Sequence, residues 1–267
     1  MIQSFLGEAL VDHSILTLII SWKAFGSPSR RSILERFKRI VPVDPRELET
    51  TISLAYVLHD IGKALSWYQE RLRETKREER ERPPGFKYHE IISAYIVNDI
   101  LRRLGITSSK EVRSLTVTSV LLHHQAMRDL KKYLELSPFD ELREILDHRP
   151  RIRPDDQLDI ELLSLRLAQI IDDISADKIK DSMLISIDKL STESLRGFLS
   201  SITYDVERLG RVFMLLPLVL VPLQMADNAA AAILRPNASP MSRLAYEVFR
   251  LIDGKYKLRR RIKGRRG

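Results

Sequence analysis

The feature that most restricts the fold is the spacing of the apolar side chains, which recur at helical intervals along almost the whole chain. This spacing places apolar residues on one face of an α-helix. No stretch shows the sustained alternation of apolar and polar residues that is typical of a half-buried strand. We therefore predict an all-α fold, a helical bundle in which no strands are needed.

Prolines, glycines and capping residues divide this pattern into separate helices. Asp44 is a suitable N-cap because Pro45 follows it at the first helical position and Glu47 stands at the third. Residues 148–157 are typical of a connection, and residues 182–203 give no clear pattern. The helices expected on this basis span residues 5–25, 30–40, 45–62, 88–104, 109–124, 158–179, 206–234 and 239–251, with a short one starting at Pro138.

The composition favours one cytoplasmic domain. The chain has 267 residues, of which 44% are apolar, and this is ample for a packed core. It contains no cysteine, so any metal must be held by nitrogen and oxygen ligands. The N-terminal residues do not resemble a signal peptide. The most apolar run, residues 212–223, is interrupted by Pro217 and Pro222 and is shorter than the roughly 20 residues that span a bilayer, so we expect a buried helix.

The net charge of +8 lies entirely in a short C-terminal segment. Residues 255–267 contain eight basic residues and no acidic one, which leaves 36 of each sign in residues 1–254. We predict a single domain over residues 1–254, with a charged loop at about 73–87, followed by a disordered basic tail over residues 255–267. The tail contacts phosphates or an acidic partner, or it only improves solubility.

Most of the six histidines lie in apolar helical segments, where an imidazole needs a specific partner. One such histidine is more often a satisfied core residue than a ligand. Two adjacent pairs change this assessment: His59-Asp60 can present two ligands to one cation, and His123-His124 lie about 100° apart on a helix and can straddle one site. The histidines are His13, His59, His89, His123, His124 and His148.

The order of these motifs resembles the HD-domain superfamily, and within it the HD nuclease of type I CRISPR interference systems. The resemblance covers about residues 5–235 and implies an HD-domain helical bundle with a metal site in its core, here in a stand-alone form without a fused helicase. The motifs that carry it are His13, His59-Asp60 with Gly62-Lys63, Trp67-Tyr68-Gln69, Tyr88-His89-Glu90 with Ser93-Ala94, His123-His124 and Ala226-Asp227.

The resemblance implies two metal ions that share Asp60. Two cations roughly 3.5–4 Å apart can stabilise both the attacking and the leaving oxygen of a phosphodiester. Five imidazoles favour manganese, cobalt, nickel or iron over magnesium, which prefers oxygen ligands, and zinc would bind too. The resemblance assigns His13, His59, Asp60 and Asp227 to one ion, and Asp60, His89, His123 and His124 to the other.

Four further residues are candidates for catalysis or substrate binding. Lys63 follows Asp60 by three residues, so on a continuing helix it faces the same side and can reach a substrate phosphate. Trp67 and Tyr68 either stack on unpaired bases or pack in the core. Gln69 matches a position of the family pattern, and its side chain either binds substrate or has a structural role. His148 has no counterpart in the family pattern and is left out of the site.

Three functions agree with these motifs. The first is a metal-dependent nuclease acting on single-stranded DNA with a separate helicase and a surveillance complex, as the resemblance implies. The second is a phosphohydrolase that acts on nucleotides or small phosphate esters in a closed pocket. The third is a non-catalytic docking scaffold, and the complete set of seven ligands argues against it.

Overall fold

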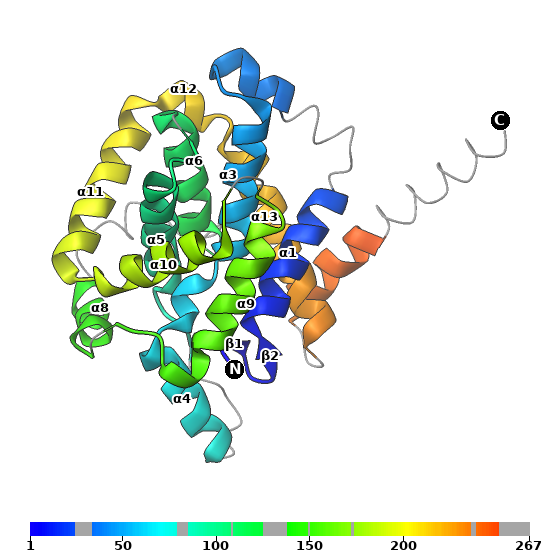
Figure 1. Cartoon of the computed structure of the whole chain (residues 1–267). Helices are drawn as coiled ribbons and strands as arrows, with labels where there is room; N and C mark the ends of the chain where they lie inside the picture. The colour runs from blue at the N-terminus through cyan, green and yellow to red at the C-terminus, as the bar shows by residue number, and fades with distance from the viewer. Residues whose placement is uncertain are drawn as a thin grey trace.

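The computed structural model describes residues 1–24, 34–78, 85–107, 109–124, 138–148, 150–171, 174–235 and 239–250. The chain is all-α, as predicted (Figure 1). Two short helices occupy residues 34–40 and 240–250. The other α-helices are α1 Leu10–Ala24, α3 Pro45–Leu58, α4 Ser66–Arg77, α5 His89–Arg103, α6 Lys110–Leu122, α8 Pro138–Asp147, α9 Gln157–Ala168, α10 Ala176–Asp188, α11 Thr192–Arg208, α12 Gly210–Phe213 and α13 Leu216–Leu234.

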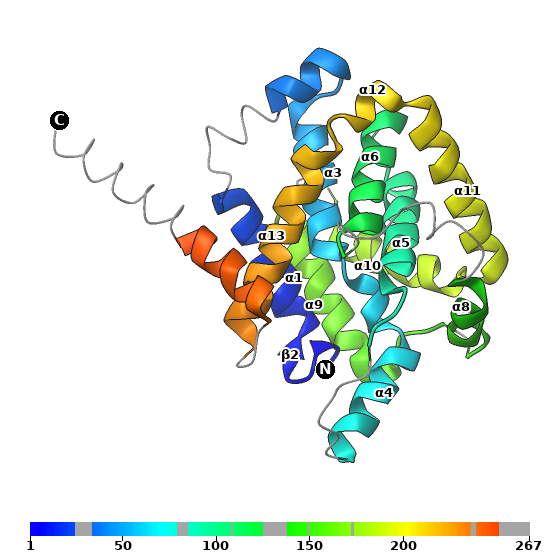
Figure 2. The same cartoon turned by 180° about the vertical axis from the view of Figure 1, so that it is seen from behind.

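Helix α3 occupies the middle of the bundle, and every residue from Thr51 to Leu58 is buried. Helices α5 and α6 pack side by side on one flank of α3, and α1 and α13 pack together on the other (Figures 1 and 2). Tyr56 ties α3 to α13 by donating its hydroxyl to the Val219 carbonyl at 2.7 Å. Helices α9 and α10 pack against each other, and α10 also covers α5. The result is one continuous apolar core around α3.

The predicted N-cap at Asp44 is present, and α6 has an N-cap as well. The Asp44 carboxylate accepts the Arg46 amide at 2.7 Å and the Glu47 amide at 3.3 Å at the start of α3. Ser109 caps α6 by accepting the Val112 amide at 3.2 Å. These side chains satisfy amides that have no partner inside the helix.

The prediction that no strands are needed was wrong at the N-terminus. Strands β1 (Gln3–Phe5) and β2 (Glu8–Ala9) form an antiparallel hairpin, and α1 begins at Leu10 instead of residue 5. Gly7 adopts φ +77°, a conformation that glycine tolerates in a tight turn. Strands of two and three residues are too short for alternation to be visible in the sequence.

Several helix boundaries also differ from those predicted. Helix α3 ends at Leu58, and a 3₁₀ helix, η1 (Ile61–Ala64), follows it. The expected helix over 158–179 is two helices, α9 and α10, and α10 starts after the N-cap Ser175. The unclear region 182–203 contains the end of α10 and most of α11. The connection 148–157 includes a second 3₁₀ helix, η2 (Pro154–Asp156).

The apolar segment near the C-terminus is interrupted as well, because α12 and α13 are separate helices. By length and composition alone, residues Gly210–Leu234 could cross a membrane. In this structure α13 packs against α1 and α6, but only part of the segment is buried, and Met214 and Val221 are exposed, so the prediction of a buried helix was only partly right. The helix 240–250 covers another side of α13 through Ala245, which clusters with Ala226, Ala229 and Ala230.

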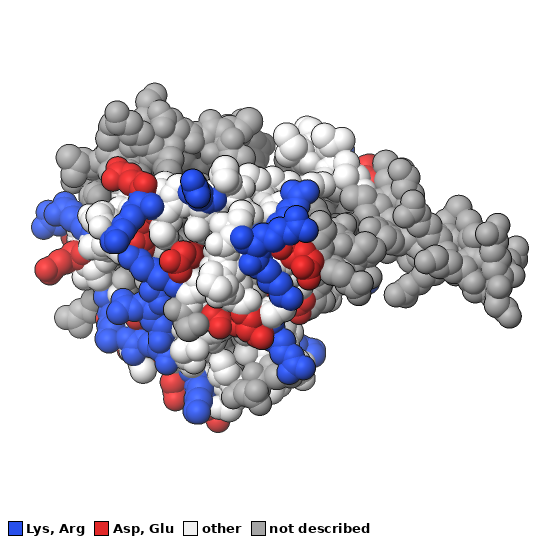
Figure 3. All heavy atoms as spheres, turned by 90° about the horizontal axis from the view of Figure 1, so that it is seen from above, with Lys and Arg blue, Asp and Glu red and all other residues white. Residues whose placement is uncertain are grey.

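The described surface carries charges of both signs. Viewed from above, lysines and arginines are interspersed with acidic residues on the exposed face (Figure 3). This distribution agrees with the formal neutrality of residues 1–254. The basic tail over 255–267 and residues 79–84 of the predicted charged loop lie outside the described residues.

The close approach of η1 to α5 yields a stability prediction. A Cβ at Gly62 would collide with the His89 carbonyl and lie 3.0 Å from the Ser93 hydroxyl oxygen. We expect Gly62→Ala to lower the free energy of unfolding by about 1–3 kcal/mol, as overpacking does. Urea denaturation in EDTA measures this change.

Gly197→Ala is the matched control. Gly197 lies inside α11, and a Cβ there meets no atom within 4 Å. Because alanine has the higher helix propensity, this variant should be more stable by about 0.5–1 kcal/mol. Equal effects of the two substitutions would contradict the packing of η1 against α5.

Candidate metal centre

Seven side chains that were predicted as ligands converge at the centre of the bundle. They come from five places in the chain: the first turn of α1, the end of α3, the start of α5, the end of α6 and the middle of α13. All but His124 are buried. The seven are His13, His59, Asp60, His89, His123, His124 and Asp227.

The first group of ligand atoms surrounds Oδ2 of Asp60. Nε2 of His13 and Nε2 of His59 each lie 3.5 Å from this oxygen. Oδ1 of Asp227 lies 2.9 Å from His13 Nε2 and 3.6 Å from His59 Nε2. These four residues therefore face a common point and could hold a metal ion.

The second group surrounds the other oxygen of the same carboxylate. Oδ1 of Asp60 lies 3.0 Å from His89 Nε2, 3.4 Å from His123 Nε2 and 3.9 Å from His124 Nε2. Asp60 thus presents one oxygen to each group, which is the arrangement of a carboxylate that bridges two cations. The two groups are the same two sets that the resemblance implied.

The break between α3 and η1 sets the position of Asp60. His59 is the C-cap of α3, and Asp60 leaves the helical conformation with φ −108° and ψ 7°. The expectation of a continuous helix to Lys63 was wrong. Lys63 still faces Asp60 because side chains three residues apart align in a 3₁₀ helix. Its Nζ donates to Asp60 Oδ2 at 2.6 Å, and the residue is 5% exposed.

The imidazole rings are oriented by hydrogen bonds at Nδ1. His59, His89 and His123 each donate Nδ1–H to the carbonyl three residues earlier, at 2.8, 2.5 and 2.5 Å. A carbonyl can only accept, so this nitrogen carries the proton and Nε2 keeps its lone pair. This is the tautomer that a metal-binding histidine needs.

These lone pairs test whether the residues fit a metal. In the described structure, the Nε2 atoms of His59, His89 and His123 and Oδ1 of Asp60 are buried without a hydrogen-bond partner. Nε2 of His89 lies only 3.0 Å from Oδ1 of Asp60, and both atoms can act as acceptors. Acceptors that face each other in a buried site require a positive charge between them. The donor set therefore fits a divalent cation bound by nitrogen and oxygen.

The charges of the site are strongly coupled. Burial would raise the pKa of Asp60, but Lys63 and His59 hold it well below its ordinary range. Burial likewise opposes ionisation of Asp227, yet the hydrogen bond with His13 and the nearby His59 ring keep its pKa well below normal. Burial would lower the pKa of His13, but Asp227 and Glu8 outweigh this and raise it to about 9. At neutral pH both carboxylates are therefore ionised.

The four candidates for catalysis or substrate binding have different environments. Lys63 lies in the site. Trp67 is half-buried and stacks under the Arg71 guanidinium at 3.9 Å. Tyr68 is 2% exposed and donates its hydroxyl to the Lys87 carbonyl, an environment that favours the core-packing alternative. Gln69 bonds both the Gln3 backbone and the Lys63 carbonyl, so its contacts tie the N-terminal hairpin to η1.

A groove opens from the metal centre to the surface. Its volume is about 370 Å³, and its lining includes three of the candidate ligands, His89, His124 and Asp227. Lys63, Arg235 and Asn228 supply polar groups along it, and Phe5 and Phe86 supply aromatic ones. Trp67, Tyr68 and Gln69 do not belong to its lining in the described residues.

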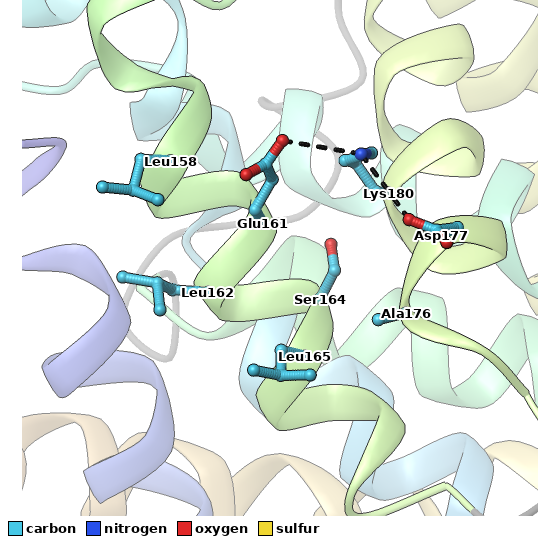
Figure 4. A pocket seen from close by; sticks show the side chains of 8 residues that line it. All are labelled: Leu158, Glu161, Leu162, Ser164, Leu165, Ala176, Asp177 and Lys180. Atoms are coloured by element: carbon cyan, nitrogen blue, oxygen red, sulfur yellow. Dashed lines mark ion pairs between the residues drawn. The ribbon is translucent and has the colours of Figure 1, made fainter.

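A second hollow, of about 360 Å³, lies between α9 and α10 (Figure 4). Leu158, Leu162 and Leu165 point along one side of it. Lys180 of α10 pairs across the hollow with Glu161 of α9 and also with Asp177 on its own helix. It contains none of the metal-binding groups found among the described residues, so the candidate site stays with the groove that His89, His124 and Asp227 line.

Two residues of the site were missed by sequence reasoning. One oxygen of Glu8 lies 2.5 Å from His13 Nδ1, an ion-pair contact, and the other oxygen pairs with Arg235 at the end of α13. Neither residue lies in a recognisable motif, and 227 positions separate them. His148 lies outside both ligand groups, as predicted.

The fold and the site define a class of protein. The chain is a helical bundle whose buried core holds a histidine-aspartate centre able to take one or two divalent cations. The family model described as "Cas3, HD domain" matches residues 7–175, which is more than half of the chain. The chain belongs to this family. Asp227 lies beyond the matched residues.

Two curated relatives agree with this assignment. Both are named CRISPR-associated endonuclease Cas3-HD. The protein from Methanocaldococcus jannaschii is 26% identical over 138 residues, and that from Saccharolobus solfataricus is 29% identical over 132 residues. Each alignment covers 49% of this chain and 53% of the relative, so the chain spans about half the length of the curated relatives it matches. No solved structure matches the chain significantly.

The pKa of His13 yields a prediction for metal binding. The pKa of this ring is about 9, so at a lower pH the ring carries a second proton. A metal ion must displace that proton from Nε2. We expect binding of Mn²⁺ at pH 7–8 to release about one proton at this residue. The apparent affinity should rise as the pH approaches 9 and level off above it. Calorimetric titration in two buffers with different ionisation enthalpies measures the released protons, and a binding enthalpy independent of the buffer would contradict the prediction.

Proposed function

We propose that this protein is a metal-dependent nuclease that cleaves single-stranded DNA. We further propose that it serves CRISPR interference together with a separate helicase and a surveillance complex. The family and the names of the two relatives support a nuclease in a CRISPR system. The observation that carries the proposal is the Asp60 carboxylate, which faces one ligand group with each oxygen.

The donor set supports two transition-metal ions. Five of the seven candidate ligands are imidazoles, which suit manganese, cobalt, nickel or iron better than magnesium. When bound, two cations would activate a water molecule and stabilise charge on the attacking and leaving oxygens of a phosphodiester. No side-chain nucleophile is needed for this reaction.

Lys63 is proposed to contact the scissile phosphate. Its ammonium group already lies at Asp60 and 5.2 Å from the centre of the Phe86 ring, at the edge of the groove. A phosphate oxygen entering the groove can accept a charge-assisted hydrogen bond from it. Lys63 would thus stabilise negative charge on the phosphoryl group.

The shape of the groove favours a single strand over a small ester. Its rim includes the exposed residues Gly85, His124 and Ser239, so it is open at the surface, whereas a phosphohydrolase for nucleotides needs a closed pocket. A volume of about 370 Å³ is too small for a double helix. Phe5 and Phe86 offer aromatic surface on which unpaired bases can stack.

The central test is Asp60→Ala. Because the carboxylate is shared by both ligand groups, we expect Mn²⁺-dependent cleavage of circular single-stranded DNA to fall to the background rate. The helical circular dichroism spectrum should be unchanged. Asp188→Ala, at an exposed position at the end of α10, is the matched control and should retain wild-type cleavage. Full activity of Asp60→Ala would exclude the shared-carboxylate site.

The same assay separates the nuclease from the alternative hydrolase. EDTA-treated protein is supplied in turn with manganese, cobalt, nickel and magnesium, and given single-stranded DNA or deoxynucleotides. Release of phosphate from deoxynucleotides without DNA cleavage would replace the proposed nuclease with a nucleotide phosphohydrolase.

Lys63→Ala tests the proposed phosphate contact. We expect turnover to fall by about 100- to 1,000-fold, the usual effect of losing a donor to the transition state. The Mn²⁺ affinity should not weaken, since Lys63 competes with a cation for Asp60 Oδ2. Steady-state kinetics and calorimetry measure the two effects. Loss of metal binding with unchanged turnover at saturating metal would show that the lysine only supports the site.

A further inference from the structure

Glu8 is a buried carboxylate that the proposed reaction does not use. It lies in β2, is 2% exposed, and contacts His13 with one oxygen and Arg235 with the other. Burying a carboxylate is costly unless charged or hydrogen-bonded partners compensate for the lost water. His13 and Arg235 therefore supply the charged partners that allow Glu8 to be buried.

His13 differs from the other buried ligand histidines in how its ring is held. His59, His89 and His123 bond carbonyls three residues earlier in their own segments, so local backbone structure orients them. His13 lies in the first turn of α1, and its Nδ1 instead faces the Glu8 carboxylate of the hairpin in an ion-pair contact of 2.5 Å. Its orientation depends on a tertiary contact.

Arg235 completes this arrangement from the opposite side. It follows α13, the helix that carries Asp227, and its guanidinium lies 4.4 Å from the centre of the Phe5 ring in β1. Glu8 therefore joins the hairpin, α1 and the end of α13. Two of the four residues in the first ligand group, His13 and Asp227, come from α1 and α13.

We propose that Glu8 is a positioning residue that, braced by Arg235, directs Nε2 of His13 into the first ligand group. A carboxylate bonded to Nδ1 fixes the tautomer and makes the ring a stronger ligand. Glu8 then sets the metal affinity of the group His13, His59, Asp60 and Asp227. The second group, which does not contain His13, is independent of it. This inference rests on the proposed use of two metal ions.

The test is a calorimetric titration of the metal-free full-length protein with Mn²⁺. Glu8→Ala should weaken one binding step by about 10- to 100-fold, the usual effect of removing such a partner, and leave the other unchanged. His13→Ala identifies the affected step, and His123→Ala identifies the other one. Glu8→Gln should recover part of the affinity, because its amide oxygen can still accept the Nδ1 proton although the ion pair with Arg235 is lost.

Asp159→Ala separates positioning from general support of the hairpin. Asp159 accepts the Ile2 amide at the other end of the hairpin and contacts no candidate ligand. This variant should lower the unfolding temperature in EDTA while both Mn²⁺ steps stay at wild-type affinity. If Asp159→Ala weakened Mn²⁺ binding in the same way as Glu8→Ala, the inference would be overturned. Equal weakening of both binding steps by Glu8→Ala would overturn it too.

The titration is also independent of the proposed nuclease activity. Wild-type protein that binds Mn²⁺ in two steps but cleaves no DNA would contradict the nuclease and leave the comparison of variants intact. Wild-type affinity of Glu8→Ala in both steps would overturn the positioning role and leave the nuclease standing.

Discussion

The Asp60 carboxylate, buried at the centre of the bundle, is the constraint on which the rest of the structure depends. A carboxylate without water is unstable unless positive or hydrogen-donating groups surround it. Here Lys63 pairs with one oxygen, and imidazole nitrogens face both. Helices α1, α3, α5, α6 and α13 must all reach this point to supply those groups. The core packs around α3 in the arrangement that allows it.

The ligands on α3, α5 and α6 lie at helix ends, and this has a physical consequence. The carbonyls near a helix end are not all used by the helix, so they can accept the Nδ1 proton of a nearby histidine. His59 and His123, the C-caps of α3 and α6, use this chemistry, whereas His89 at the start of α5 bonds the Phe86 carbonyl that precedes the helix. In all three, Nε2 is the nitrogen that faces the ligand groups. The same region contains a residue in the left-handed conformation, Tyr88, with φ +64°. It also contains a close backbone contact, between Gly62 and the His89 carbonyl. Such conformations persist where surrounding packing supports them, often next to a functional site.

Electrostatic balance links the site to the groove above it. In the metal-free protein, Lys63 and a protonated His13 neutralise carboxylates that would otherwise repel each other. Metal ions would replace these charges and leave Lys63 available to a phosphate at the open face. The site then combines a mostly buried ligand set with a groove that is open at the surface. This combination supports a nuclease more than a small-molecule hydrolase.

The sequence by itself determined the helical class and the helix cap at Asp44, and the resemblance carried by its motifs predicted the two ligand groups. Helical periodicity and capping are local signals, and the ligand motifs are short runs with a characteristic order. Only the tertiary structure decided the hairpin, the break after Leu58 and the packing of Tyr68, because these depend on contacts between distant segments. The pairing of Glu8 with Arg235 and His13 is the clearest case. A glutamate in a two-residue strand and an arginine at a helix end carry no pattern until the fold brings them together.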